Sequence, residues 1–403
     1  MIRFYILIHY YFLYFAFLAY IIMKIPIIMN KELIYLTYQT FPSEVANTIQ
    51  TIDNLKYFAR KNYKVKLIFP LRSKTSTDNV SLLKKYYGFD DEIIFEGVKH
   101  NLPFGKLKFF EKYLFLISHY LWSRKISKNF SVKNNKEVQF FTRSDWIFYY
   151  LSRKGLNIIF ECHQLSKTRK WVLRNSIHEA GAKVIFLNKN LLFDSGIDKD
   201  LYSEKIEVIP NGVDEGLFSK INNKKDYEIV FSGNLKRFDE GRGLEFVINA
   251  FSNKNMPKEY TLKVIGGPAS EVNKLKEYAS KLGLNNKIEF LDRLDRNSTI
   301  SNIEKASIGL LINSSENLHS VKYSSPLKYF EYMYAGLKII AINFPSHKIL
   351  PFAENILFFN ENDENSFINA IKDSRVLEPM NKKYLKNITM DARVNKIISL
   401  INK

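Results

Sequence analysis

Short apolar runs alternate with segments of helical periodicity along almost the whole chain. In the first half the runs lie at 32–38, 65–70, 92–98, 138–143, 156–161 and 183–188. A second series lies at 227–232, 260–265, 287–291, 307–312, 338–342 and 355–359. Each run is bounded by turn residues, as buried strands are, and most intervals, such as 43–62, have the period of a helix. The pattern predicts an α/β protein with two doubly wound parallel sheets.

The length of the chain and one polar run predict how it divides. At 403 residues the chain is too long for one ordinary core, so we expect two domains. The polar run 222–226 separates the two series of strands. We therefore expect a first domain at 31–220, a second at 221–381 and a basic tail at 382–403, with the hydrophobic segment 1–30 outside the fold.

The segment from Ser325 to Gly336 has the sequence of a short helix with both ends marked. Ser325 can cap its start, Pro326 suits the first helical position, and Gly336 can take the left-handed conformation that ends a helix. Predicted strands flank it, so its N-terminus should lie at the carboxyl edge of a sheet, where free amides attract phosphate. Lys328 places a cation in the first turn, against the helix dipole, which a bound polyphosphate would explain.

Two further motifs accompany this helix. Val-Ile-Pro-Asn-Gly-Val-Asp at 208–214 is followed by Phe218, and Ile-Val-Phe-Ser-Gly-Asn-Leu at 229–235 is followed by Arg-Gly-Leu at 242–244. In order and spacing the three motifs resemble the retaining glycosyltransferases of family four. The resemblance implies a GT-B fold, in which two Rossmann-like domains face each other across a cleft. It also implies that the tail crosses back onto the first domain.

The same resemblance implies metal-independent transfer of a hexose from a nucleotide sugar, with no cofactor besides that co-substrate. The catalytic residues would be His163, Arg242 and Lys328. Arg242, Lys328 and the amides at Leu327 and Lys328 would stabilise the departing diphosphate. The family uses a basic pair here: its lysine is matched by Arg242, but its arginine, expected just after Gly233, is replaced by asparagine.

Other residues of the second domain are implied in binding the donor. Glu331 matches the carboxylate that accepts hydrogen bonds from the donor ribose; the alternative is a surface glutamate paired with Lys328. The more common form of the family has another glutamate eight positions earlier, where this chain has Tyr323, and Glu316 in the same loop could substitute. The segment 290–294 resembles the edge that contacts the base. We predict that the donor-binding residues are Gly233, Asn234, Arg293, Glu316, Ser325, Pro326, Leu327 and Glu331.

Two residues of the first domain follow or end predicted strands and should therefore face the cleft. His163 follows the run 156–161, where the family often has a histidine near the transferred sugar, although a lone histidine is more often structural. Arg143 ends the run 138–143 and could meet an anionic acceptor. Asn211, in the motif between the domains, is a third cleft candidate. The loop 38–43 has no glycine, whereas many relatives carry a glycine-rich phosphate loop there.

Positive charge is concentrated in the first domain. The net charge is +19, and residues 31–200 carry 29 Lys and Arg against 16 Asp and Glu, which accounts for +13 of it. Such a field favours an anionic partner, namely a membrane surface, a nucleic acid or a phosphorylated substrate; lysine that merely solvates the surface is the alternative. We expect no nucleic-acid binding, because no basic-aromatic recognition module is found.

Two segments raise the question of a membrane. The segment 107–127 mixes aromatic residues with lysine and arginine, so it is either a basic helix on an anionic membrane or a crossover helix packed on the sheet. Residues 4–23 carry no charge and are long enough to span a bilayer. They could be an anchor, an interfacial segment or translated upstream sequence ahead of Met29. We expect a cytoplasmic protein, peripheral to or anchored in the inner face of the cell membrane.

The remaining chemistry narrows the functional alternatives. Cys162 is the single cysteine, which excludes an internal disulfide and agrees with a reducing compartment, and no His/Asp/Glu cluster has metal-ligand spacing. The leading hypothesis is a glycosyltransferase that adds a sugar to a surface glycan or lipid-linked acceptor. The alternatives are a nucleotide-sugar epimerase, which would need paired carboxylates such as Glu161 and Asp145, and an inert binding protein, which Asn234 and Tyr323 would favour.

Overall fold

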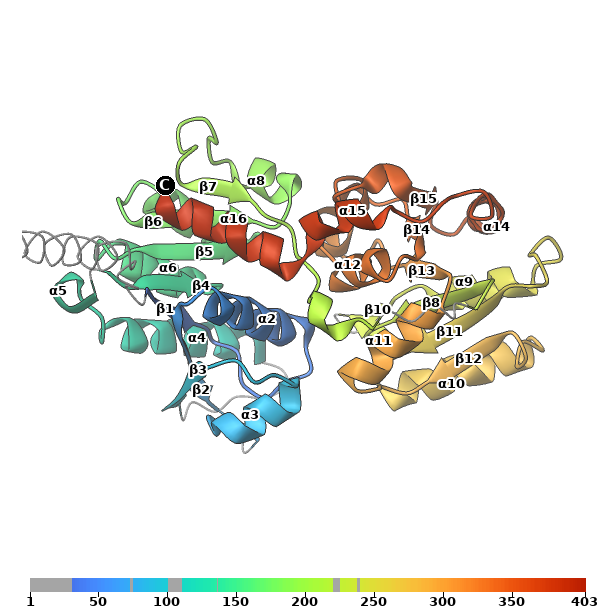
Figure 1. Ribbon diagram of the computed structural model, residues 1–403, viewed down its shortest axis with the longest axis horizontal. Coiled ribbons are helices and arrows are strands. Elements are labelled where there is room, and N and C mark those ends of the chain that lie inside the picture. The colour runs from blue at the N-terminus through green and yellow to red at the C-terminus, as the bar shows by residue number, and fades with distance from the viewer. Residues whose placement is uncertain (1–30, 73–74, 101–110, 136, 220–224, 238–239) are drawn as a thin grey trace, which may run out of the picture.

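The computed structural model describes residues 31–403 except 73–74, 101–110, 136, 220–224 and 238–239, and it has two α/β domains side by side (Figure 1). The predicted hydrophobic segment 4–23 lies outside the described residues, as does the start of the predicted helix 107–127. Among the described residues, no helix has the combination of length and hydropathy needed to cross a membrane.

The first domain is built on a seven-stranded parallel sheet with the strand order β3-β2-β1-β4-β5-β6-β7. Six of its strands overlap the predicted runs. The sequence did not predict β7, because it has only three residues and lies where the motif between the domains begins. The strands are β1 (Glu32–Leu36), β2 (Lys64–Leu71), β3 (Ile93–Lys99), β4 (Gln139–Thr142), β5 (Ile158–Cys162), β6 (Ala182–Phe186) and β7 (Ile206–Val208).

Helices cover both faces of this sheet, as its continuous apolar strands require. Phe58, Leu83 and Val394 belong to the core cluster on one face, and Trp122 and Leu173 to the cluster on the other. The first face is covered by α2 (Ala46–Arg60), α3 (Val80–Tyr87) and α16 (Met390–Asn402). The second is covered by α4 (Glu111–Ser127), α6 (Asp145–Ser152), α7 (Lys167–Ser176) and α8 (Lys189–Ser195), and the short α5 (Val132–Asn135) precedes β4.

The second domain has a six-stranded parallel sheet with the order β12-β11-β8-β13-β14-β15, and all six strands overlap the predicted runs. A small hairpin of β9 (Lys236–Arg237) and β10 (Glu240–Gly241) was not predicted. The sheet consists of β8 (Glu228–Ser232), β11 (Thr261–Ile265), β12 (Ile288–Leu291), β13 (Ile308–Leu311), β14 (Lys338–Ile342) and β15 (Ile356–Phe359). The prediction of two doubly wound parallel sheets is therefore confirmed.

The helices of the second domain again form two layers. One layer, with Val247, Leu275 and Phe367 in its core cluster, consists of α9 (Leu244–Ser252), α10 (Ala269–Lys281) and α14 (Glu364–Asp373). The other, with Ile303 and Phe330 in its cluster, consists of α11 (Arg296–Lys305), α12 (Leu327–Tyr334) and α15 (Lys382–Leu385). A short helix, α13 (Pro345–Lys348), follows β14. Strand order reverses beside β1 in the first sheet and beside β8 in the second, and doubly wound proteins bind ligands at such points.

The C-terminal segment leaves the second domain and packs on the first (Figure 1). Val394 and Leu400 of α16 are buried in the core of the first domain, and Lys183 donates to the carbonyl of Leu400 at 2.7 Å. The segment crosses the chain between the domains where Thr389 pairs with Val213. A side chain at Gly212 would meet the carbonyl oxygen of Thr389 at 2.9 Å, so the close crossing requires glycine there.

The predicted helix 325–336 forms, but it begins later than expected. Its N-cap is Pro326 and α12 begins at Leu327, so the prediction that Ser325 caps the helix is wrong. The hydroxyl oxygen of Ser325 instead accepts the backbone N–H of Asn211 at 3.1 Å. The predicted end is confirmed, because Gly336 has a φ of 70°. A proline at the N-cap has no side-chain acceptor, so no side chain caps the first amides of α12.

Candidate active site between the two domains

The loop after β8 contains the predicted Gly233 and Asn234. Gly233 has a φ of 126°, and its N–H donates to the carbonyl of Ile265 at the end of β11. A side chain at Gly266 would collide with the carbonyl oxygen of Gly233. The two loops can therefore approach this closely only because position 266 is glycine.

Arg242 lies at the carboxyl end of β13, next to this loop. Its guanidinium donates to the side-chain oxygen of Asn313 at 2.7 Å, and Asn313 is buried two residues beyond β13. Burial raises the pKa of the Tyr332 hydroxyl, and the positive charge of Arg242 opposes that rise; the same hydroxyl accepts the backbone N–H of Ser232 at the end of β8. Arg242 is thus held at the point where strand order reverses in the second sheet.

Lys328, in the first turn of α12, lies along the same part of the sheet. Its ammonium group is 3.8 Å from the centroid of the Phe231 ring on β8, which is cation–π geometry. Together with burial, its positive charge helps to lower the pKa of His347 to about 4. The side chain is therefore directed toward the carboxyl end of β8.

Glu331 is buried and forms an ion pair with Arg296, at 2.6 Å, in the first turn of α11. The alternative interpretation of Glu331, a surface pair with Lys328, is wrong because Glu331 is only 4% exposed and pairs with Arg296 instead. Arg296 was missed in the sequence. Its position directly after β12 and its N-cap residue Asp295 were the only signals that could have found it.

Arg293 supplies a cation beside the loop where the family's arginine is replaced. It donates to the side-chain oxygen of Asn234 at 2.7 Å, and it also forms an ion pair with Glu44 of the first domain. Glu316, by contrast, is exposed, and its backbone N–H donates to the hydroxyl of Ser314. The structure therefore brings Arg293 to Asn234 and leaves Glu316 on the surface of its loop.

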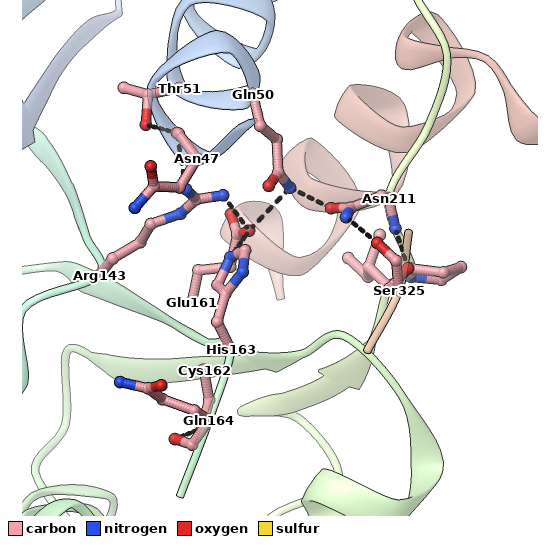
Figure 2. A network of polar contacts seen from close by, with 12 residues as sticks. Asn47, Gln50, Thr51, Arg143, Glu161, Cys162, His163, Gln164, Asn211 and Ser325 are labelled. Carbon is pink, nitrogen blue, oxygen red and sulfur yellow. Dashed lines mark hydrogen bonds and ion pairs between the residues drawn. The ribbon is translucent and has the colours of Figure 1, made fainter. Parts of the chain in front are cut away.

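On the side of the first domain, Glu161 is the centre of a buried polar network (Figure 2). One carboxylate oxygen accepts from His163 at 2.5 Å and from Arg143 and Gln50 at 3.2 Å each, and it forms an ion pair with Arg393 at 3.0 Å. These donors come from β5, α16, the end of β4 and α2. Arg393 and Gln50 were not identified in the sequence, because their partner lies far away in the chain.

The charges in this network decide the protonation of His163. Burial alone would raise the pKa of Glu161, but the positive charges of Arg393 and Arg143 hold that pKa well below its ordinary value. Burial and Arg143 lower the pKa of His163 to about 4, in spite of the neighbouring carboxylate. His163 is therefore neutral at pH 7 and donates its Nε2–H to Glu161. Its Nδ1 is left as a hydrogen-bond acceptor.

The network reaches the second domain through Asn211 (Figure 2). The side-chain oxygen of Asn211 accepts from Gln50, and its Nδ2 donates to the carbonyl of Ser325 at 2.5 Å. Gln50, Asn211 and Ser325 are all buried. Three side chains thus connect His163 with the residue that precedes the N-cap of α12.

Tyr323 occupies the position where the family more commonly has a second glutamate, and its side chain contacts the first domain. Its ring belongs to the core cluster of the first domain, and its hydroxyl donates to Asp194 at 2.5 Å. Lys322 pairs with the same carboxylate at 3.1 Å, and Asn190 donates to the carbonyl of Lys322. This part of the loop therefore attaches the second domain to α8 and presents no carboxylate to a donor.

The two carboxylates considered for an epimerase, Glu161 and Asp145, are both paired with other side chains of this chain. Glu161 is surrounded by four donors, and Asp145 is buried, faces Arg169 at 3.5 Å and accepts the N–H of Trp146. Among the described residues, no cluster of His, Cys, Asp and Glu could hold a metal ion.

These features define a two-domain protein of the GT-B fold, with candidate site residues at the carboxyl ends of both sheets. Residues 226–374 match the family model described as "Glycosyl transferases group 1". This match and the fold support the transfer of sugars as the class of activity. No curated protein sequence matches the chain.

Three solved structures illustrate the likeness. Sucrose-phosphate synthase from Thermosynechococcus elongatus has a TM-score of 0.66 at 15% identity, over 92% of this chain and 98% of its own. HepE from Anabaena, in complex with UDP and glucose, has a TM-score of 0.61 at 14% identity, over 92% and 99%. The lipopolysaccharide outer core galactosyltransferase WaaB, in its apo form, has a TM-score of 0.61 at 11% identity, over 92% and 99%. At such identities the likeness establishes the fold.

Proposed function

We propose that this protein transfers a hexose from a nucleotide diphosphate sugar to a hydroxyl of a surface glycan or lipid-linked acceptor, with retention of configuration. One observation carries the proposal. Arg242 and Lys328 both lie at the carboxyl ends of β8 and β13, beside the N-terminus of α12, where Pro326 provides no side-chain cap. Cations and the backbone amides of a helix N-terminus, gathered at one sheet edge, suit a diphosphate leaving group.

In the proposed reaction the chain's own groups balance the charge of the leaving diphosphate. Arg242 and Lys328 would stabilise the developing charge together with the amides of Leu327 and Lys328, so the proposal includes no metal ion. Arg293, which already contacts Asn234, would supply the cation that the family has at that position. Glu331 would accept the hydroxyls of the ribose while Arg296 holds its carboxylate in place.

His163 would act on the sugar from the side of the first domain. Because its Nε2–H is donated to Glu161, its Nδ1 would accept a hydrogen bond from a sugar hydroxyl. Arg143 and Asn211 would shape the acceptor side, since both belong to the network around Glu161.

The donor and the acceptor are further parts of the proposal. The HepE structure holds UDP and glucose, which makes UDP-sugars the first donors to test. WaaB is named for transfer to lipopolysaccharide, which supports a glycan acceptor carried on lipid. Such an acceptor would place the protein in the cytoplasm, at the inner face of the cell membrane.

The test is a thermal-shift screen against a panel of nucleotide sugars, followed by turnover assays with the donors that stabilise the protein. R242A and K328A should abolish the shift, whereas K281A, at an exposed lysine of α10, should leave it unchanged. The proposal fails if no nucleotide sugar stabilises the protein, or if R242A and K328A bind donor like the unmodified chain.

A second candidate, a protein that binds nucleotide or glycan without turnover, has one observation in its favour. The hydroxyl of Tyr323 donates a hydrogen bond to Asp194. The second glutamate that the family more commonly uses to bind the nucleotide sugar therefore has no counterpart at that position. Slow hydrolysis of a bound nucleotide sugar would exclude this candidate. Tight binding without product, in the presence of acceptor glycans, would support it.

A further inference from the structure

Helix α4 has two apolar faces, and only one of them packs on the sheet. Trp122 and Ile126 are buried in the core cluster of the first domain. Tyr113, Ile117 and Leu121, spaced four residues apart on the opposite side, are 66%, 55% and 42% exposed. Leu116, next to this stripe, is also exposed, so the helix covers the sheet and presents a second apolar stripe to solvent.

Aromatic side chains extend this stripe across the neighbouring helices. Tyr120 of α4 meets Trp146 of α6 edge to face, with ring centroids 5.0 Å apart. Trp171 of α7 lies 5.2 Å from the ring of Tyr149 and is about half exposed. Tryptophan and tyrosine combine an apolar ring with a polar tip, as residues at a membrane–water interface do. We call this surface of α4, α6 and α7 the α4 face.

The described exposed charges of the α4 face have one sign. Among the described side chains of the three helices, the exposed charged groups are all cations, namely Arg124, Lys125, Lys167 and Arg174. The one described carboxylate there, Asp145, is buried and faces Arg169. An apolar and aromatic stripe bordered, among the described side chains, by cations is complementary to an anionic lipid surface.

The opposite side of the first domain provides a comparison. Helix α3 also exposes apolar residues, with Leu82 at 56% and Tyr86 at 47%. The charges around α3 are of both signs, however, because the helix carries Lys84 and Lys85, whereas Asp78 precedes it and Asp90 and Asp91 follow it. Anionic lipid would be attracted less strongly to the mixed charges of α3 than to the cations of the α4 face, so charge distinguishes the two surfaces.

We propose that the α4 face docks on a membrane rich in anionic lipid. The inserted groups would be Tyr113, Leu116, Ile117 and Leu121, while Arg124 and Lys125 would contact lipid phosphates. Phe115, on the same helix, contacts the ring of Tyr38, which follows β1 at the carboxyl edge of the sheet. The docked membrane would therefore lie close to the candidate site, and the benefit for a lipid-linked acceptor rests on the proposed function.

The test is co-sedimentation of the full chain with vesicles of phosphatidylglycerol and phosphatidylcholine, without nucleotide sugar, so that its outcome does not depend on the proposed activity. I117E/L121E should lower the vesicle partition coefficient at least about tenfold. R124Q/K125Q should weaken binding and reduce its dependence on salt. L82E, at an exposed leucine of α3 with matching exposure, should bind like the unmodified chain.

A second readout reports on the α4 face directly. The chain has three tryptophans, Trp122, Trp146 and Trp171, and all belong to α4, α6 and α7. Vesicles containing brominated anionic lipid should quench tryptophan fluorescence of the unmodified chain, and vesicles of neutral brominated lipid should quench it much less. The proposal is overturned by equal sedimentation of I117E/L121E and L82E, by the absence of quenching, or by loss of a dimer as the only effect of I117E/L121E.

Discussion

Asn211, in the chain between the domains, donates from its side chain to the carbonyl of Ser325, 2.5 Å away, and from its backbone to the hydroxyl of the same residue at 3.1 Å. Ser325 is thereby prevented from capping α12 and is tied to the first domain through Gln50. Asn211 therefore helps to fix the position of the α12 N-terminus relative to the first domain.

The substitution N211A should reduce both stability and donor binding. It leaves the Ser325 carbonyl without its donor in a buried site and removes one of the two acceptors of Gln50, which costs about 1–3 kcal/mol of unfolding free energy. Donor affinity should fall as well, because the amides of α12 lose their fixed position. Urea unfolding and calorimetric titration with a UDP-sugar measure the two effects. N395A, at a surface asparagine of α16, is the control; equal behaviour of the two variants would contradict the role of Asn211.

Replacement of Glu161 tests the network around His163. E161Q keeps the shape of the side chain but removes its charge, leaving Arg143 and Arg393 without an anion in a buried site. We expect a loss of about 3–5 kcal/mol of unfolding free energy, the usual effect of removing one partner of a buried ion pair. E207Q, at an exposed pair with Lys403, should cost almost nothing. A loss below about 1 kcal/mol for E161Q would mean that the arginines find other partners.

The pKa of His163 predicts a pH dependence of stability. Its folded pKa of about 4 lies below the ordinary value of 6.5, so the unfolded chain binds a proton that the folded chain does not. Its contribution is complete above pH 6.5 and is lost as the pH falls from 6.5 toward 4. In that window H163N should reduce the slope of stability against pH by about 1.4 kcal/mol per pH unit. Unfolding curves at several pH values measure this; an unchanged slope would show that His163 is not kept neutral by folding.

A pair of variants separates the two roles of Glu331. If the carboxylate binds ribose, E331Q should weaken donor affinity about tenfold, which corresponds to about 1.4 kcal/mol. R296Q removes only its partner and should affect stability more than donor binding. Calorimetry with a nucleotide sugar and thermal unfolding of both variants give the answer. Loss of stability in both variants with donor affinity unchanged would make Glu331 a structural residue.

The contact between Tyr323 and Asp194 should couple the domains. A double-mutant cycle of Y323F and D194N should give a coupling energy of about 1 kcal/mol in unfolding free energy. The hydrogen bond from Tyr323 lowers the pKa of Asp194. The stabilisation is therefore present above the ordinary carboxyl pKa and is lost as the pH falls through the lowered one. Additive effects of the two changes would show that the hydrogen bond contributes nothing.

The sequence alone determined the two sheets, because the hydrophobic period and the turn residues of each strand are local properties. It also marked the end of α12, since Gly336 supplies the left-handed residue by itself. The sequence did not predict the three-residue strand β7, because so short a run has no measurable hydrophobic period.

Only the tertiary structure decided which polar groups meet. Glu331 pairs with Arg296, 35 residues earlier, and not with its helical neighbour Lys328. The hydroxyl of Tyr323 donates to Asp194 of the other domain. Residues brought together across the fold leave no period in the chain, and packing chooses between partners of similar chemistry. For the same reason, the sequence left open which face of α4 packs on the sheet and which faces solvent. The sequence showed which residues of that helix are apolar, and only the packed sheet showed which of them remain in solvent.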